Sequence, residues 1–127
     1  MNGYILDDTA VLALGAGHRG LSRVVVATHE GAGFHAYVPA LCLVAAQSER
    51  RGIADHVGSL PAIEIVELDL SAVETVGGLI GDGVDWRFAH AVEVARPTFD
   101  WPDGRPVLTV KPPAYDGLGV PTIHIRT

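Results

Sequence analysis

A short apolar stretch near the start of the chain runs directly into Asp7 and Asp8, and Thr9 and further apolar residues follow. This pattern predicts a buried strand over 3–7 and a helix over 8–14, with Asp8 or Thr9 as the N-cap. Aspartate is almost never buried unless it is paired or bound to a metal. Ligands bind outside the carboxyl ends of the strands in open α/β sheets, so we expect a functional crevice at Asp7.

The alternation of strand and helix patterns continues along the chain and predicts its fold class. Ser71 and Glu74 form a capping-box pattern at the start of one helix. The alternation favours a single domain over 1–127, a three-layer α/β/α structure with a mainly parallel central sheet. Further helices are expected over 21–30, 40–51, 54–57, 72–80 and 85–95, a helical turn over 113–116, and further strands over 35–38, 63–68, 106–110 and 120–125.

Composition limits the class of protein. The chain has 127 residues, of which 48% are hydrophobic, as in packed globular domains. No apolar run approaches the roughly 18 residues of a membrane span, and the N-terminus lacks the charged region of a signal peptide. The single cysteine, Cys42, lies in an apolar run and suits buried packing in a reducing compartment. We therefore expect a cytoplasmic protein that does not associate with a membrane.

The net charge and the context of a glycine motif argue against two classes of protein, those that bind nucleic acid through a basic face and those that bind dinucleotides. A formal net charge of −6 argues against a broad basic face that grips nucleic acid, although it leaves open an enzyme that meets a phosphodiester through bound metal. Residues 15–20 read G-x-G-x-x-G, the dinucleotide-binding pattern. That pattern must follow a strand and needs an acid about 20 residues later. Here a helix is expected before it and no such acid follows, so we interpret it as a turn between helices.

Four segments follow one another along the chain: residues 4–10, residues 37–43, residues 85–91, and residues 107–111 with Tyr115. In this order they resemble the PIN (PilT N-terminus) domain, a fold of many single-strand-specific ribonucleases, including the VapC-type toxins of bacterial toxin–antitoxin pairs. The first is similar to the family's opening strand with its acid and small hydroxyl residues, and the second to its second strand and helix. The third looks like the acid that opens a later helix, and the fourth like the last strand of the site and the aromatic residue after it.

The resemblance implies a metal site that this sequence provides only in part. PIN nucleases hold Mg²⁺ or Mn²⁺ with three or four carboxylates, and such ions activate water and stabilise the leaving oxygen. Asp7 and Asp85 stand where the resemblance places the first and third catalytic, metal-binding acids. The second acid is absent from residues 44–46, and Lys111 stands near the position of the fourth. Two unit charges about 4 Å apart interact by roughly 4 kcal/mol at an effective dielectric of 20. The loss of two carboxylates and the gain of an ammonium group should therefore abolish most of the affinity for a metal ion.

Other acids offer partial substitutes for the missing ligands. Glu49 follows one helical turn after residue 45, on a turn that leads away from the strand ends, and Asp82 precedes Asp85 by three residues. Asp8 is adjacent to Asp7, but we expect it to point elsewhere. The crevice should also be lined by Thr9, Thr109 and Lys111, and Lys111 is a candidate to neutralise Asp7 and Asp85 in place of metal.

Three functional hypotheses follow. The first is a PIN-like domain whose metal-dependent cleavage is impaired or lost and which binds single-stranded RNA, an antitoxin or other protein partner, or a second copy of itself as a homodimer. The second is a working Mg²⁺- or Mn²⁺-dependent endoribonuclease, toxin-like, in which Glu49 or Asp82 completes the site. The third is a small-molecule or nucleotide binder in which Lys111 contacts a phosphate.

Overall fold

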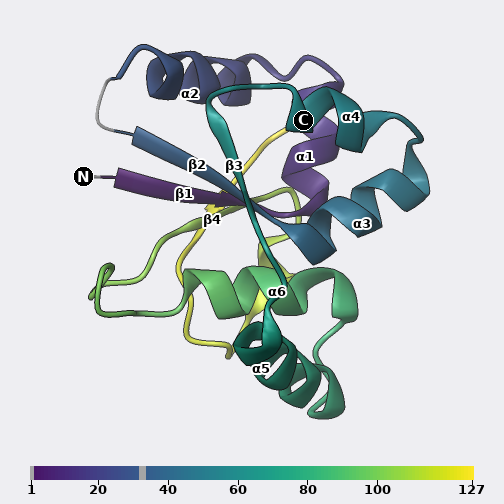
Figure 1. The fold of residues 1–127 in the computed structure, drawn as a ribbon, viewed down its shortest axis with the longest axis vertical. Helices are drawn as coiled ribbons and strands as arrows, with labels where there is room; N and C mark the ends of the chain where they lie inside the picture. The colour runs from purple at the N-terminus through teal and green to yellow at the C-terminus, as the bar shows by residue number, and fades with distance from the viewer. Residues whose placement is uncertain (1, 32–33) are drawn as a thin grey trace.

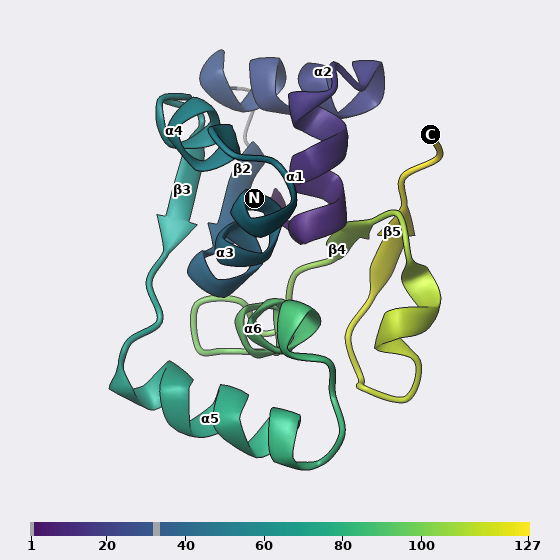
Figure 2. The ribbon, with the colours of Figure 1, turned by 90° about the vertical axis from the view of Figure 1, so that its right-hand side faces the viewer.

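A five-stranded parallel sheet forms the centre of the molecule (Figures 1 and 2), and its strand order is β3-β2-β1-β4-β5. The structure, a computed structural model, describes residues 2–31 and 34–127. Because β1 pairs in parallel with both β2 and β4, the carboxyl ends of these three strands lie side by side at one edge of the sheet. The strands are β1 (Asn2–Leu6), β2 (Phe34–Pro39), β3 (Ile63–Val66), β4 (Val107–Thr109) and β5 (Thr122–His124).

Helices cover both faces of the sheet and complete the three-layer α/β/α structure that the sequence predicts. One face is covered by α1, α2 and α4, and the other by α6, while α3 spans the carboxyl edge (Figures 1 and 2). The helices are α1 (Asp8–Gly15), α2 (Arg19–His29), α3 (Ala40–Glu49), α4 (Ile53–Gly58), α5 (Leu70–Gly81), α6 (Trp86–Ala95) and the 3-10 helix η1 (Pro112–Tyr115).

The strands divide their side chains between two apolar clusters, because successive residues of a strand point to opposite faces. Leu6 and Leu108 pack against α1 and α2, whereas Ile5 and Val107 pack against α6. All four side chains are buried. The central strands therefore read as continuous apolar runs, which is the expected signature of a parallel sheet covered on both faces.

The N-caps of α1 and α5 differ from those that the sequence predicts. Asp7, and neither Asp8 nor Thr9, is the N-cap of α1. Asp69, and not Ser71, caps α5, so this helix begins at Leu70, two residues earlier than predicted, and the predicted capping box does not form. In both cases an aspartate upstream of the predicted cap accepts a hydrogen bond from the amide three residues later, which a short carboxylate does as well as a hydroxyl.

The glycine motif over 15–20 is a turn between α1 and α2, as its sequence context predicts. Gly15 lies at the end of α1, where a β-carbon would collide with the side chain of Ile53. Gly17 has a φ of +87°, which favours glycine because it lacks a β-carbon. His18 then caps α2 by accepting a hydrogen bond from the amide of Leu21. Helix packing and turn geometry thus account for the two glycines.

Within the described residues, no helix is both long enough and apolar enough to span a membrane.

Candidate functional site

Asp7 lies at the carboxyl end of β1, where its side chain is completely buried. One carboxylate oxygen accepts hydrogen bonds from the amide of Ala10 at 3.0 Å and the hydroxyl of Thr9 at 2.6 Å. The other oxygen accepts a hydrogen bond from the phenol of Tyr115 at 2.7 Å. Three donors therefore satisfy a carboxylate that could not otherwise be buried without a large free-energy cost.

Thr9 and Thr109 join the start of α1 to the end of β4. The hydroxyl of Thr9 accepts a hydrogen bond from the amide of Val110 at 2.8 Å and lies 3.2 Å from the hydroxyl of Thr109. The single hydroxyl proton of Thr9 goes to Asp7, so Thr109 is the donor of the pair. Thr109 in turn accepts from the amide of Lys111 at 3.0 Å. This chain of hydrogen bonds fixes the carboxyl ends of two neighbouring strands around Asp7.

Tyr115 completes the buried cluster from the opposite side. Its ring meets Phe88 of α6 edge to face, with 5.5 Å between the ring centroids. Burial and the neighbouring carboxylate of Asp7 raise the pKa of the Tyr115 phenol well above its usual range, so the phenol stays protonated and continues to donate to Asp7. The cluster is thus a closed structural unit rather than an open set of ligands.

A cavity of about 370 Å³ opens beside this cluster, at the carboxyl edge of the sheet. Of the two aspartates at the β1–α1 junction, Asp8 lines this cavity and Asp7 does not. The side chain of Asp8 thus points elsewhere than that of Asp7, as expected: tertiary contacts enclose Asp7, whereas Asp8 lines the cavity. The cavity is lined by Asp8, Thr9, Leu12, Ala13, Glu49, Asp85, Arg87, Phe88, Val110, Lys111 and Thr127.

Asp8 is incompletely satisfied in the cavity. Its side chain is buried, and its Oδ1 atom has no hydrogen-bond partner. Burial, reinforced by the negative charge of Asp7, raises the pKa of this carboxyl from 3.8 to about 6. An unpartnered buried oxygen with a raised pKa marks a position where a donor from a bound group would relieve a free-energy cost.

The remaining predicted site residues fall on different sides of the cavity. Asp85 is exposed and caps α6 by accepting a hydrogen bond from the amide of Arg87 at 3.0 Å. Glu49 also lines the cavity, from the end of α3, although the sequence suggests that this turn leads away from the strand ends. Asp82 is the C-cap of α5 and is not among the lining residues.

Cationic side chains face the same cavity. Lys111 lines it, but within residues 2–31 and 34–127 it forms no ion pair with Asp7 or Asp85, so the predicted neutralising triad is absent. Arg87 also lines it, and its Nε atom is buried without a hydrogen-bond partner. Arg87 lies beside Asp8 closely enough for its positive charge to oppose the rise in that carboxyl's pKa. Acidic and basic side chains therefore line one cavity.

The residues present do not fit a divalent metal ion. The Asp7 carboxylate already accepts three hydrogen bonds from protein donors, and both of its oxygen atoms are involved. Asp8, Glu49 and Asp85 line the cavity from three separate elements, and Arg87 and Lys111 line the same cavity. In the part of the chain that the structure describes, no three His, Cys, Asp or Glu side chains are grouped so that they could hold a metal. Mg²⁺ requires closely placed oxygen ligands in near-octahedral geometry.

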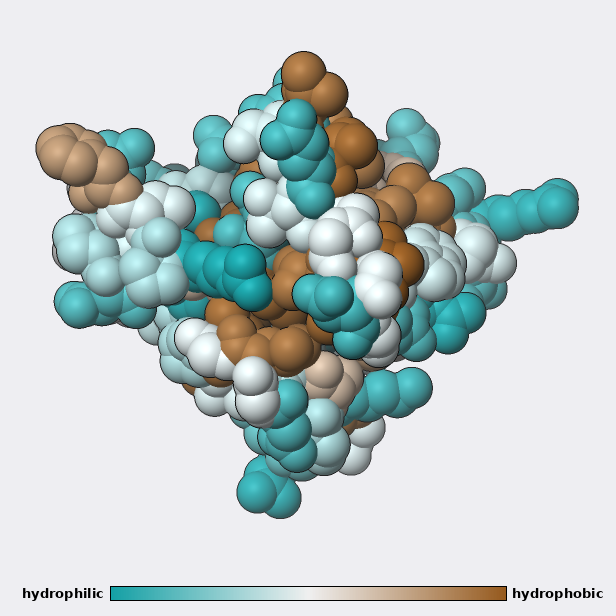
Figure 3. Space-filling view, turned by 90° about the horizontal axis from the view of Figure 1, so that it is seen from below, coloured by the Kyte–Doolittle hydropathy of each residue, from teal (hydrophilic) through white to brown (hydrophobic). Residues whose placement is uncertain are grey.

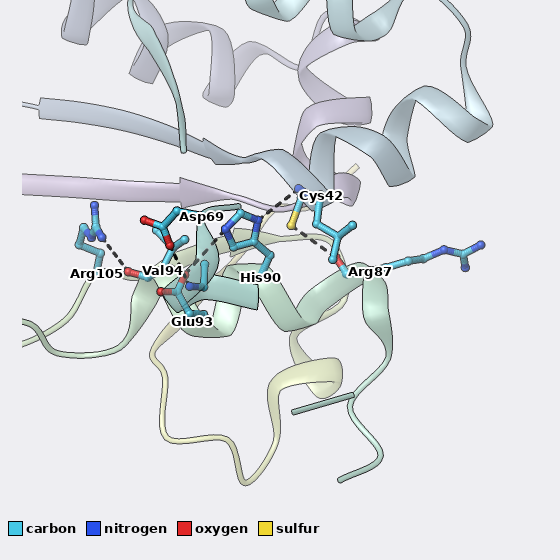
Figure 4. Close-up of polar contacts among 9 residues, drawn as sticks. Cys42, Asp69, Arg87, His90, Glu93, Val94 and Arg105 are labelled. Atoms are coloured by element: carbon cyan, nitrogen blue, oxygen red, sulfur yellow. Dashed lines mark hydrogen bonds and ion pairs between the residues drawn. The ribbon is translucent and has the colours of Figure 1, made fainter. Parts of the chain in front are cut away.

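His90 holds the neighbouring end of β2 (Figure 4). Its ring is fully buried, and its Nδ1 atom accepts a hydrogen bond from the amide of Leu41 at 3.2 Å. Pro39, the N-cap of α3, offers no capping side chain, so His90 of α6 caps this helix from outside. Burial lowers the pKa of His90, although the charge of Asp69 acts in the opposite direction. The carboxyl end of β2 is thus fixed by a neutral imidazole.

Sequence reasoning missed three groups that matter at this edge: the guanidinium of Arg87, the capping imidazole of His90, and the donor function of Tyr115. Only Arg87 had a usable local signal, since it lies two residues after the helix cap Asp85. The other two depend on long-range contacts. His90 lies 49 positions from its partner Leu41, and Tyr115 lies 108 positions from Asp7. Comparison of the sequence with profiles of known protein families and with curated proteins finds no match.

Proposed function

We propose that this protein is a PIN-like domain in which metal-dependent RNA cleavage has been lost and which acts by binding a protein partner. The observation that carries the proposal is the state of Asp7. Its carboxylate is enclosed and holds three hydrogen bonds from protein donors, so binding of a metal would have to break part of a buried network. The acid that resembles the first ligand of the family thus stabilises the fold.

The charge of the molecule favours a protein over RNA as the bound partner. The chain has a net charge of −6, and an RNA backbone would be repelled by such a surface without bound metal. The cavity presents carboxylates beside Arg87 and Lys111. A cavity lined by charges of both signs matches the mixed side chains of a polypeptide better than it matches the uniform charge of a phosphate backbone. Asp8, with its unpartnered oxygen, would accept a donor from that polypeptide.

Titration with Mn²⁺ tests the loss of metal chemistry directly. A ligand at 100 times its dissociation constant stabilises a protein by about 2.7 kcal/mol, which raises Tm by several degrees. We expect no saturable rise in Tm for the wild-type protein up to millimolar MnCl₂, and the same result for Asp8→Asn. A saturable rise that Asp8→Asn abolishes would overturn the proposal.

A cleavage assay on fluorescent single-stranded RNA tests the rival hypothesis of a working endoribonuclease. The position of Glu49 in the same cavity as Asp8 and Asp85 is the observation that favours this rival. We expect no Mn²⁺-dependent cleavage above that of the variants Asp85→Asn and Glu49→Gln. Cleavage by the wild-type protein that both substitutions abolish would establish the endoribonuclease, with Mg²⁺ or Mn²⁺ as its cofactor, and a small antitoxin encoded beside it would be the natural partner.

A further inference from the structure

The outer face of α5 carries an apolar stripe that nothing covers among the described residues. Leu70, Val73 and Ile80 are 75%, 46% and 41% exposed. Together with Gly77 they follow a spacing of three, four and three residues, which places all four on one side of the helix. Apolar residues with this spacing form the line of contact along which one helix packs against another. We call these four residues the α5 stripe.

Helix α5 lies at the periphery of the molecule, where it packs mainly against α6 through its other side (Figure 2). The inward side chains Ala72, Val76 and Leu79 are buried. Figure 3 views the molecule from the side of α5 and shows hydrophobic side chains gathered on this face. An isolated exposed apolar side chain is ordinary, but a helical stripe of them marks an interaction surface.

Gly77 makes the centre of the stripe flat. A β-carbon built at Gly77 or at the neighbouring Gly78 would meet no atom within 4 Å, so packing within this protein does not require either glycine. Each glycine costs a helix interior about 1 kcal/mol relative to alanine. The absence of a side chain at Gly77 lets a second helix approach the backbone of α5 closely, as small residues do at other helix crossings.

Charge around the stripe identifies the chemistry of the occupant. Helix α5 and its two capping residues carry three carboxylates and no lysine, arginine or histidine. Two copies of α5 paired in either direction would place carboxylates against carboxylates, which disfavours a second copy. An anionic lipid surface is disfavoured for the same reason. A helix whose apolar seam is flanked by lysine and arginine would satisfy both the stripe and its acidic rim. The acids of this rim are Asp69, Glu74 and Asp82.

We propose that the α5 stripe docks a basic amphipathic helix of a partner protein. The inference rests on the proposed protein-binding function and names the surface and the partner chemistry. Apolar side chains of the partner pack against Leu70, Val73 and Ile80, with its backbone over Gly77, while its basic side chains meet the acidic rim. The surface lies on α5 and is separate from the cavity at Asp8.

A matched pair of synthetic peptides tests the docking. Each has about three heptads with leucine at the seam positions, and the flanking positions carry lysine and arginine in one peptide and glutamate in the other. By fluorescence anisotropy at low salt, we expect the basic peptide to bind the wild-type protein about tenfold more tightly than the acidic one. The double variant Val73→Glu, Ile80→Glu should weaken binding of the basic peptide about tenfold or more. Both positions are exposed, so circular dichroism should show an intact fold.

The matched control is Val26→Glu, because Val26 is 52% exposed on α2 and lies outside the α5 stripe. We expect this variant to bind the basic peptide as the wild type does. Equal binding of the two peptides, or undiminished binding by the double variant, would overturn the proposal. So would a wild-type dimer in sedimentation velocity that the double variant dissociates, since the occupant would then be a second copy. None of these results bears on Mn²⁺ binding, so this proposal and the loss of metal chemistry can fail separately.

Discussion

The two aspartates at the β1–α1 junction are neighbours in sequence but lie in two opposite environments. On the interior side, Asp7 has a donor for each of its oxygens and supports three elements of the fold. On the cavity side, Asp8 has an oxygen without a partner and a pKa raised to about 6. The comparison separates a structural acid from a candidate binding acid. Buried carboxylates stabilise a protein only where donors meet them, and destabilise it where none do.

The strongest test of this comparison is Asp7→Ala. The substitution removes the N-cap of α1 and leaves the phenol of Tyr115 and the hydroxyl of Thr9 without their acceptor. We expect the free energy of unfolding, measured by urea denaturation, to fall by about 3–4 kcal/mol. Asp100→Ala, at an exposed position in the loop before β4, is the control and should change little. A loss below about 1 kcal/mol for Asp7→Ala would show that the buried network is not formed.

Tyr115→Phe sharpens the comparison by removing one donor and little else. The carboxylate of Asp7 then keeps its charge but has a buried oxygen without a donor. We expect a loss of about 2 kcal/mol in the free energy of unfolding. In a double-mutant cycle, the effects of Tyr115→Phe and Asp7→Asn should be non-additive because the two groups share one hydrogen bond. Additive effects would contradict the direct contact.

Asp8→Asn should have the opposite sign from Asp7→Ala. The pKa of Asp8 is about 6 in the folded state against 3.8 for the ordinary group, so between these values the folded state binds more protons than the unfolded state. Asp8 therefore lowers the stability of the wild type as the pH rises through this window, and the full penalty is present above about pH 6. Because the cavity is open to water, we expect Asp8→Asn to stabilise the protein by about 1–2 kcal/mol at pH 7.

Urea denaturation at a series of pH values checks this expectation. The advantage of Asp8→Asn over the wild type should vanish below about pH 4, where both folded and unfolded states hold a neutral side chain at this position. The exposed Asp100→Asn is the matched control and should show no such pH dependence. An advantage that is constant across the range would mean that titration of Asp8 does not cause it.

The smallest effect should come from Asp85→Ala. Asp85 is exposed, and its one observed hydrogen bond caps α6. We expect a loss of about 0.5–1 kcal/mol in unfolding experiments, as for an ordinary helix cap. Asp85→Ser, which keeps a capping side chain, should restore most of the stability. A loss as large as that of Asp7→Ala would place Asp85 in a buried network and bring the two regions together.

Sequence patterns predicted the elements well and the site in part. Asp7 was assigned to the end of β1 and Asp85 to the start of α6, because polar residues beside apolar runs mark element boundaries. Glu49 was named as a partial substitute ligand on a turn expected to lead away from the strand ends, yet it lines the cavity, because the direction in which the end of α3 projects depends on its packing. The caps were missed where an aspartate competed with a nearby serine or threonine, because both residue types accept the same amide hydrogen bond.

The sequence by itself determined the alternation of strands and helices, the parallel sheet and the presence of acids at its carboxyl edge. These follow from local periodicity and from short polar residues at element ends, which act over a few positions. Only the tertiary structure decided which aspartate is enclosed and which faces the cavity. That choice depends on Tyr115 and on the end of β4, about a hundred residues away, because a carboxylate is buried only where distant donors converge on it.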